Sequence, residues 1–215
     1  MQIADNIIKR ALSNVYFIWG RGKTTIANRL REKHGFYIYS TDDSRDWHMK
    51  NAHPVSQPYM CRNFEKEYGV KSFWELPKEV IAEREKHFVQ EMTPMILVDL
   101  LLLSKQHEVI LCEGDIDYTV VAPIATHTVH LRNCGTRFDW FERTDHADAL
   151  DSITKRTDLS AQEKEALIQN AYALVAGNDG TMPDWVTALQ IYNIDWYDDT
   201  GVDRTLADVE AYFGF

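Results

Sequence analysis

Apolar residues recur at two different spacings along the chain, and these spacings predict helices that alternate with short strands. Ile3, Ile7 and Leu12 lie at helical spacing, which indicates an amphipathic helix at the start of the chain. Short runs of β-branched and aromatic residues are typical of buried strands when turn-forming residues bound them. Five such runs occur: Val15–Trp19, Phe36–Ser40, Glu108–Cys112, Thr128–Arg132 and Ile191–Trp196.

Helical patterns occupy most of the intervals between these runs. Thr24–Lys33 follows the first run, and Gly35 can end that helix in a left-handed conformation. Pro77–Met92 is also helical in pattern, and we expect Pro94 to bend or break it before Met95–Leu103. Two more helices are predicted: one from the Ser160–Glu163 capping box to about Ala176, with Gly177 as its stop, and one capped by Thr205 that reaches Phe213.

The alternation of strands and helices predicts the fold class. Strands that helices separate imply right-handed crossovers and a mostly parallel sheet covered on both faces. We therefore predict one α/β domain of three layers over residues 1–215. The stretch from Asp42 to about Ser72 is polar and aromatic and has few periodic elements. Ligands of such sheets bind beyond the carboxyl ends of the strands, so the residues after each strand are the candidates for chemistry.

Composition and charge narrow the classes of function. The chain has 45% hydrophobic residues, and its 23 Lys and Arg stand against 33 Asp and Glu. This balance argues against a chain that coats nucleic acid or an anionic membrane, although a local basic pocket remains compatible with it. The three cysteines form no CxxC pair, which disfavours a disulfide framework or zinc ribbon and favours the cytoplasm.

Neither a transmembrane segment nor a signal peptide is predicted. The longest apolar run, Met95–Leu103, is too short to span a bilayer, and the amino terminus lacks the pattern of a signal peptide. Asp99 interrupts this run, and a carboxylate within an apolar helix needs a polar partner.

The first strand leads into a glycine-containing turn, Gly20–Thr25 (GRGKTT), that is suited to phosphate. Glycine lets backbone N–H groups converge on an anion, and the following helix adds its positive end. Lys23 can reach the terminal phosphates, and the Thr24 hydroxyl can bind Mg²⁺. The segment resembles a Walker A P-loop, which implies ATP or GTP and Mg²⁺ as cofactors. The predicted phosphate-binding residues are Gly20, Arg21, Gly22, Lys23, Thr24 and Thr25.

The turn departs from the usual P-loop pattern in its length. That pattern has four residues between its two glycines, whereas only Arg21 separates Gly20 from Gly22. Either the loop is three residues shorter than usual, or residues are missing from the sequence. A short loop could still use Gly22, Lys23 and Thr24, but it would wrap the β-phosphate less completely. The alternative interpretation is an ordinary glycine turn between a strand and a helix.

Acidic residues follow the second strand in the segment Thr41–Arg45 (TDDSR). This segment resembles the DDxR segment of polynucleotide 5′-kinases, and it is similar to the acidic position of zeta-toxin kinases, chloramphenicol phosphotransferase and shikimate kinase. The resemblance implies that Asp42 is the general base and that Arg45 clamps an anion, with Asp43 and Arg62 as further substrate-binding residues. The alternative is an Asx-type turn whose carboxylates are solvated.

Two further groups complete the candidate site. Glu113 ends the third strand, which is the Walker B arrangement that positions Mg²⁺, so we assign it to the metal with Thr24. A strand-end turn at Gly114 is the alternative. In adenylate-kinase-like families a lid follows the fourth strand, and the resemblance makes Arg143 and Arg156 its candidate catalytic arginines. The alternative for either arginine is a solvated surface position.

Together these motifs resemble small P-loop kinases of the shikimate and adenylate kinase group, closest to the chloramphenicol phosphotransferase and zeta-toxin type. The resemblance implies a five-stranded parallel sheet of order 2-3-1-4-5, with helical acceptor and lid insertions. It also implies transfer of the γ-phosphoryl group of ATP or GTP to a hydroxyl of a small molecule.

Two other functions remain open. One is a regulatory or degenerate nucleotide-binding protein without turnover, which the short turn supports. The other is a kinase of nucleic-acid 5′ ends, which requires a basic groove near Arg45 and Arg62 that the net charge disfavours. The sequence does not specify the oligomeric state.

Overall fold

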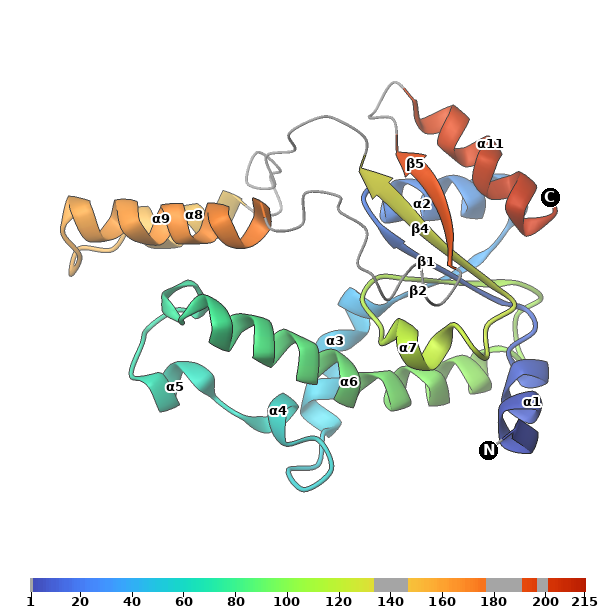
Figure 1. Ribbon diagram of the computed structural model, residues 1–215, viewed down its shortest axis with the longest axis horizontal. Helices are drawn as coiled ribbons and strands as arrows, with labels where there is room; N and C mark the ends of the chain where they lie inside the picture. Colours follow the sequence, from blue (N-terminus) through green and yellow to red (C-terminus); the bar gives the residue numbers. More distant parts are fainter. Residues whose placement is uncertain (1, 134–146, 177–190, 197–200) are drawn as a thin grey trace. The chain divides into compact units, whose positions relative to one another are not determined.

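The computed structural model describes residues 2–133, 147–176, 191–196 and 201–215. These residues form a five-stranded sheet in which every pair of neighbouring strands is parallel, in the order β2-β3-β1-β4-β5 (Figure 1). The predicted α/β fold class and the strand order 2-3-1-4-5 are therefore confirmed. The strands are Val15–Gly20 (β1), Tyr37–Ser40 (β2), Ile110–Glu113 (β3), His127–Asn133 (β4) and Tyr192–Trp196 (β5).

Helices connect the strands along the described part of the chain. The longest is α6 (Lys78–Leu103), which precedes β3 in the chain. The others are α1 (Gln2–Ala11), α2 (Lys23–His34), α3 (Thr41–Asn51), α4 (Pro58–Cys61), α5 (Phe64–Tyr68), the 3₁₀ helix η1 (Phe73–Glu75), α7 (Tyr118–Val121), α8 (Ala147–Thr154), α9 (Ala161–Ala176) and α11 (Val202–Phe213). None of the helices described is long and apolar enough to cross a membrane.

Each face of the sheet carries its own apolar core, because successive strand residues point to opposite faces. Phe17 of β1 belongs to the core that α6 covers, whereas its neighbour Ile18 belongs to the core that α2 and α11 cover. Figure 1 shows α2 and α11 on one side of the sheet and α6 and α7 on the other. The side chains that these helices bury include Met92, Ile96 and Leu100 of α6, Ile26 and Leu30 of α2, and Val209 and Phe213 of α11.

The chain divides into two compact units. The first contains the sheet and comprises Met1–Cys61, Lys86–Cys134 and Met182–Phe215, while the second comprises Arg62–Glu85 and Gly135–Thr181. The second unit thus draws on the region between β2 and β3 and on the region after β4, where the acceptor and lid insertions were expected. The prediction of one domain over residues 1–215 stays a prediction.

The residues after β2 form a helix, although no periodic element was predicted there. The helix α3 begins directly at Thr41 because Ser40 caps it: the Ser40 side chain accepts a hydrogen bond from the backbone N–H of Asp43 at 3.3 Å. Asp42 and Asp43 lie in its first turn, where negative charge is favourable. Local capping therefore forms a helix that the apolar pattern does not reveal.

Two other local predictions need correction. Pro94 does not break the helix: it lies inside α6, which continues past it to Leu103, since Met92 and Ile96 on either side are buried in the core. Thr205 does not cap the last helix, because α11 already begins at Val202. The Thr205 hydroxyl instead donates to the Asp195 carbonyl of β5 at 3.2 Å.

The other helix ends follow the sequence prediction. Gly35 has a φ of 74° and ends α2 in the left-handed conformation. The capping box of α9 is confirmed: the Ser160 N–H donates to Glu163 Oε2 at 2.7 Å, and the Glu163 N–H donates to Ser160 Oγ at 3.3 Å. Gly177, its predicted stop, lies outside the described residues.

Candidate functional site

The turn between β1 and α2 consists of two residues, Arg21 and Gly22. Gly20, which precedes it, has a φ of 94°, and a Cβ there would lie 2.2 Å from the carbonyl oxygen of Leu131. Only glycine fits this close approach to β4. The backbone N–H of Arg21 donates to the same Leu131 oxygen at 3.1 Å. The amide of Arg21 is therefore bound to the neighbouring strand.

The amino end of α2 offers donors for an anion. The first N–H groups of an α-helix have no acceptor within the helix. The N-cap residue, Gly22, has a φ of 76° and makes no side-chain cap hydrogen bond to this end of α2. The N–H groups of Lys23, Thr24 and Thr25 thus add to the positive end of the helix at the carboxyl edge of the sheet.

Four of the predicted side chains meet at this edge. Lys23 Nζ lies 3.5 Å from Asp42 Oδ2 and 3.7 Å from Glu113 Oε2. The Thr24 hydroxyl donates to Glu113 Oε2 at 3.1 Å. The sheet order explains this convergence, because β3 lies between β1 and β2, and Glu113 is in register with Ile18 of β1 and Ser40 of β2.

The two carboxylates differ sharply in exposure. The Glu113 side chain is 4% exposed, whereas that of Asp42 is 58% exposed. A buried carboxylate needs compensating partners, and Lys23 and Thr24 supply them to Glu113. Asp42 lies at the start of α3 in solvent, so it can exchange Lys23 for another partner at little cost.

The residues at this edge fit a magnesium ion that phosphate helps to hold. The Thr24 hydroxyl and the Glu113 carboxylate are the hard oxygen ligands that Mg²⁺ prefers, and Mg²⁺ usually takes only one or two protein ligands beside phosphates and waters. The Thr41 hydroxyl lies against Gly114, the residue after Glu113, and has no hydrogen-bond partner within the described residues although it is buried. No group of three or more His, Cys, Asp or Glu suited to a metal occurs in the part of the chain described.

The other predicted site residues of the first unit have local roles. Arg45 lies on α3 with its guanidinium 4.0 Å from the centre of the Phe88 ring. Asp43 is exposed in the first turn of the same helix. The structure thus places Asp42, Asp43 and Arg45 on one helix, and of these Asp42 contacts Lys23.

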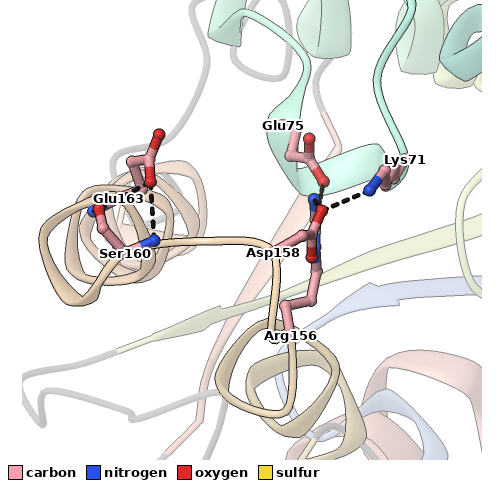
Figure 2. Close-up of polar contacts among 6 residues, drawn as sticks. All are labelled: Lys71, Glu75, Arg156, Asp158, Ser160 and Glu163. Atoms are coloured by element: carbon pink, nitrogen blue, oxygen red, sulfur yellow. Dashed lines mark hydrogen bonds and ion pairs between the residues drawn. The ribbon is translucent and has the colours of Figure 1, made fainter.

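Two predicted arginines belong to the second unit, and each binds carboxylates of that unit. Arg62 donates to Glu67 at 2.7 Å, which lowers the pKa of Glu67. Arg156 donates to both carboxylate oxygens of Asp158, at 2.9 and 2.7 Å, and also to Glu75 (Figure 2). Lys71 completes this cluster by pairing with Asp158, whose pKa the bonds from Arg156 and Lys71 hold well below its usual range. Arg143 lies outside the described residues.

A partly buried polar cluster that contacts α3 was predicted only in part. The sequence indicated that Asp99 needs a polar partner, and the structure supplies two. The Tyr39 hydroxyl of β2 donates to Asp99 Oδ2 at 2.8 Å, and His48 Nε2 of α3 lies 3.3 Å from the same oxygen. These partners are distant in sequence, so only the topology of the sheet brings them together.

A separate groove of about 640 Å³ lies between α1 and the end of α6. Its lining includes Arg10, Asn14, Val98, Leu102 and Lys105. Asn14 precedes β1 and Lys105 precedes β3, so this groove is at the amino ends of the strands. Since ligands of parallel sheets bind at the opposite edge, the groove is not our candidate site.

Comparisons with known proteins leave the function to be argued from the site. No protein-family model matches this chain, and no curated protein matches it. Dephospho-CoA kinase from Campylobacter jejuni is a solved structure to which the chain aligns with a TM-score of 0.43 and 13% identity, over 94% of this chain and 98% of that one.

Proposed function

We propose that this chain is a phosphotransferase that moves the γ-phosphoryl group of ATP or GTP to a hydroxyl of a small molecule. One observation carries the proposal: Lys23, Thr24, Asp42 and Glu113 meet beside the open amino end of α2, at the carboxyl edge of a parallel sheet. A cation, a hydroxyl, a buried carboxylate and an exposed carboxylate are the groups that phosphoryl transfer requires there.

The phosphates bind at the amino end of α2 in this proposal. The N–H groups of Lys23, Thr24 and Thr25 donate to phosphate oxygens, and the ammonium of Lys23 exchanges the exposed Asp42 for the terminal phosphates. Lys23 keeps its contact with Glu113, which is buried and fixed by the strand. Asp42 is thereby released to face the acceptor.

The metal is assigned to Thr24 and Glu113. When it is bound, Mg²⁺ neutralises charge that develops on the phosphate oxygens. Thr24 presents its hydroxyl oxygen and Glu113 its carboxylate from the end of β3. The hydrogen bond between them keeps the two oxygens 3.1 Å apart, so that one metal ion could contact both.

Asp42 is the proposed general base. The acceptor oxygen forms a bond to the γ-phosphorus while the bond between that phosphorus and the β–γ bridging oxygen breaks. The proton of the acceptor hydroxyl passes to Asp42, and the nucleoside diphosphate leaves with the electron pair of the broken bond. The exposure of Asp42 leaves room for an acceptor beside it.

Substitution of Lys23 tests the phosphate assignment. Lys23→Met keeps the aliphatic stem and removes the charge, so we expect ATP affinity in the presence of Mg²⁺ to fall about ten- to a hundredfold, the usual worth of a charge-assisted bond. Lys105→Met, at the other edge of the sheet, is the control and should bind as the wild type does. Unfolding curves check that both variants are folded. Equal ATP affinity in wild type and Lys23→Met would remove the phosphate assignment.

A screen then tests the transfer itself. The wild type is incubated with labelled ATP, Mg²⁺ and a panel of small hydroxyl compounds, and the label is followed into the acceptor. A labelled product supports the proposal. Nucleotide binding without any transfer, even to water, contradicts it.

A nucleotide-binding protein without turnover is the second candidate function. The short turn favours it, because a two-residue turn whose Arg21 amide is bound to Leu131 leaves fewer amides for the β-phosphate. The labelled-ATP screen separates the two candidates. The kinase of nucleic-acid 5′ ends has less support, since Arg45 stacks on Phe88 and Arg62 binds Glu67 in the other unit.

A further inference from the structure

The helix that carries Asp42 has few apolar contacts to hold it in place. The buried residues of α3 are Thr41 and His48, both polar. Neither of its two large apolar side chains is buried in the core: Trp47 is 56% exposed and Met49 is 37% exposed. Apolar burial therefore contributes little to the attachment of α3, and polar contacts must fix its position.

These contacts include a cluster of three side chains from three elements. The Tyr39 hydroxyl of β2 lies 2.8 Å from Asp99 Oδ2 of α6 and 3.0 Å from His48 Nε2 of α3. His48 Nε2 also lies 3.3 Å from Asp99 Oδ2. Nearby, Arg45 packs over Phe88 of α6. The cluster thus links α3 to both the sheet and the long helix beneath it.

The hydrogen bonds of Tyr39 determine which ring nitrogen of His48 carries the hydrogen. Tyrosine has one hydroxyl proton, and Tyr39 donates it to Asp99. The Tyr39 oxygen can then only accept from His48, so Nε2 must carry a hydrogen. Nδ1 of the neutral ring is left as an acceptor, and it is buried without a partner in the described part of the chain.

The surroundings keep these groups in the required protonation states. Burial lowers the pKa of His48, although the charge of Asp99 opposes this, and the ring is therefore neutral near pH 7. Burial and the bond to Asp99 raise the pKa of Tyr39 well above its ordinary value, although a hydrogen bond with the Ser44 side chain opposes this. A protonated Tyr39 and a neutral His48 are the forms that the hydrogen bonds need.

We propose that Tyr39, His48 and Asp99 are positioning residues that hold α3 so that Asp42 stays beside Lys23. The inference rests on the proposed function, since Asp42 matters as the general base. His48 follows Asp42 by six residues, about 9 Å along the helix, and Tyr39 precedes Asp42 by three. A displacement of α3 by about 1 Å would reach Asp42 directly, and such errors cost about a hundredfold in rate.

Two substitutions of His48 form a matched pair. The amide nitrogen of glutamine can take the place of Nε2 and donate, whereas the shorter asparagine places its amide near Nδ1. The probe is turnover of ATP with Mg²⁺, with water as the acceptor. We expect His48→Asn to lower kcat by about ten- to a hundredfold, with unchanged KM for ATP, and His48→Gln to keep most of the rate. Equal losses in both variants would overturn the proposal.

Removal of the tyrosine hydroxyl gives an independent comparison. Tyr39→Phe deletes a buried hydroxyl beneath α3, and Thr205→Val deletes one that donates to Asp195 on the other face of the sheet. Tyr39→Phe should lower kcat, while Thr205→Val should not, even when both lose similar stability. If kcat falls in both variants in proportion to their loss of stability, the result contradicts a positioning role for Tyr39.

A readout without turnover separates this inference from the proposed function. Amide hydrogen exchange of Thr41–Asn51 should quicken in His48→Asn but not in His48→Gln, and nitrogen NMR of the wild type should find the Nε2–H tautomer. Both results would stand even if the protein bound no nucleotide, in which case only the proposed function fails. An Nδ1–H tautomer, or unchanged exchange in His48→Asn, overturns the cluster itself.

Discussion

The four side chains at the carboxyl edge of the sheet differ in what their removal should do. Glu113 is buried with Lys23 and Thr24 as partners, so its substitution disturbs structure as well as chemistry. Asp42 is largely exposed, and its ion pair with Lys23 adds little to stability. Asp42 is therefore the residue at which the chemistry can be tested apart from the fold.

Asp42→Asn removes the base and keeps the shape of the side chain. We expect kcat for ATP turnover to fall by about 10²- to 10⁴-fold, the usual contribution of a general base, while ATP affinity stays similar. Asp46→Asn, one turn further along α3 and also exposed, is the control and should keep its rate. Steady-state kinetics and calorimetric titration measure the two quantities. A wild-type rate in Asp42→Asn would mean that Asp42 is a solvated residue of α3 and not the general base.

Gly20, just before the turn into α2, can be compared with Gly35, which ends α2. Both have positive φ, but a Cβ at Gly20 meets the Leu131 carbonyl at 2.2 Å, whereas a Cβ at Gly35 meets nothing within 4 Å. Gly35→Ala should cost about 1 kcal/mol of unfolding free energy through backbone strain alone. Gly20→Ala should cost clearly more, because the backbones of β1 and β4 must also separate. Denaturant unfolding measures both, and equal costs contradict the close approach.

Much of the candidate site was predictable at this scale, because Lys23 and Asp42 follow a strand in sequence and Glu113 ends one. Parallel strands bring such residues to one edge, whatever their distance along the chain. The partners of Asp99 were not predictable in the same way. Tyr39 is 60 residues away from it, and only the order of strands and the path of α6 decide that they meet.

At the scale of elements, α2 and α11 cover the same face of the sheet and share a buried carboxylate. Glu210 accepts from Lys33 Nζ at 2.7 Å, and its other oxygen lies 2.6 Å from His34 Nε2. Burial raises the pKa of Glu210, but the bonds to Lys33 and His34 outweigh it, and the net pKa is lowered. The contact between the helices is therefore sensitive to acid.

The sign of this dependence follows from the lowered pKa. Stability from Glu210 is present above the unfolded-state pKa of about 4.3 and is lost as the pH falls through the lower folded-state pKa. Glu210→Gln should thus lower the unfolding midpoint at neutral pH and flatten its fall in acid. Thermal unfolding from neutral pH down to about pH 3 measures both. Glu32→Gln, at an exposed position of α2, should follow the wild type, and an unaltered curve in Glu210→Gln would contradict the assignment.

Two features of the helices, the existence of α3 and the continuity of α6, did not follow from the apolar pattern. Periodicity detects helices that bury an apolar stripe, and α3 buries Thr41 and His48 instead. Pro94 was expected to bend or break the helix, and it does not break α6, because burial of Met92 and Ile96 on both sides of it outweighs the lost hydrogen bond. In the first case local capping forms a helix that periodicity does not detect, and in the second tertiary packing overrides a local preference.

At the scale of the whole molecule, the strand order followed from the resemblance to P-loop kinases, whereas the division into two units did not. The second unit joins two segments that are distant in sequence, Arg62–Glu85 and Gly135–Thr181. Arg156 and Asp158 from one segment bind Glu75 and Lys71 from the other (Figure 2). Ion pairs between side chains therefore link the two segments, and the pattern of apolar residues does not predict such pairs.

These ion pairs predict that the second unit opens as a cooperative body of its own. Arg156→Met removes the side chain that binds both Glu75 and Asp158, so hydrogen exchange of residues 62–85 and 147–171 should quicken together. The strands β1 and β3 should keep their protection, because the sheet of the first unit does not depend on Arg156. Lys155→Met, at an exposed neighbour that pairs with Asp151, is the control and should leave all of these rates unchanged. If protection of β1 and β3 falls as much as that of the second unit, the chain unfolds as the single domain that the sequence predicted, and the two units have no separate stability.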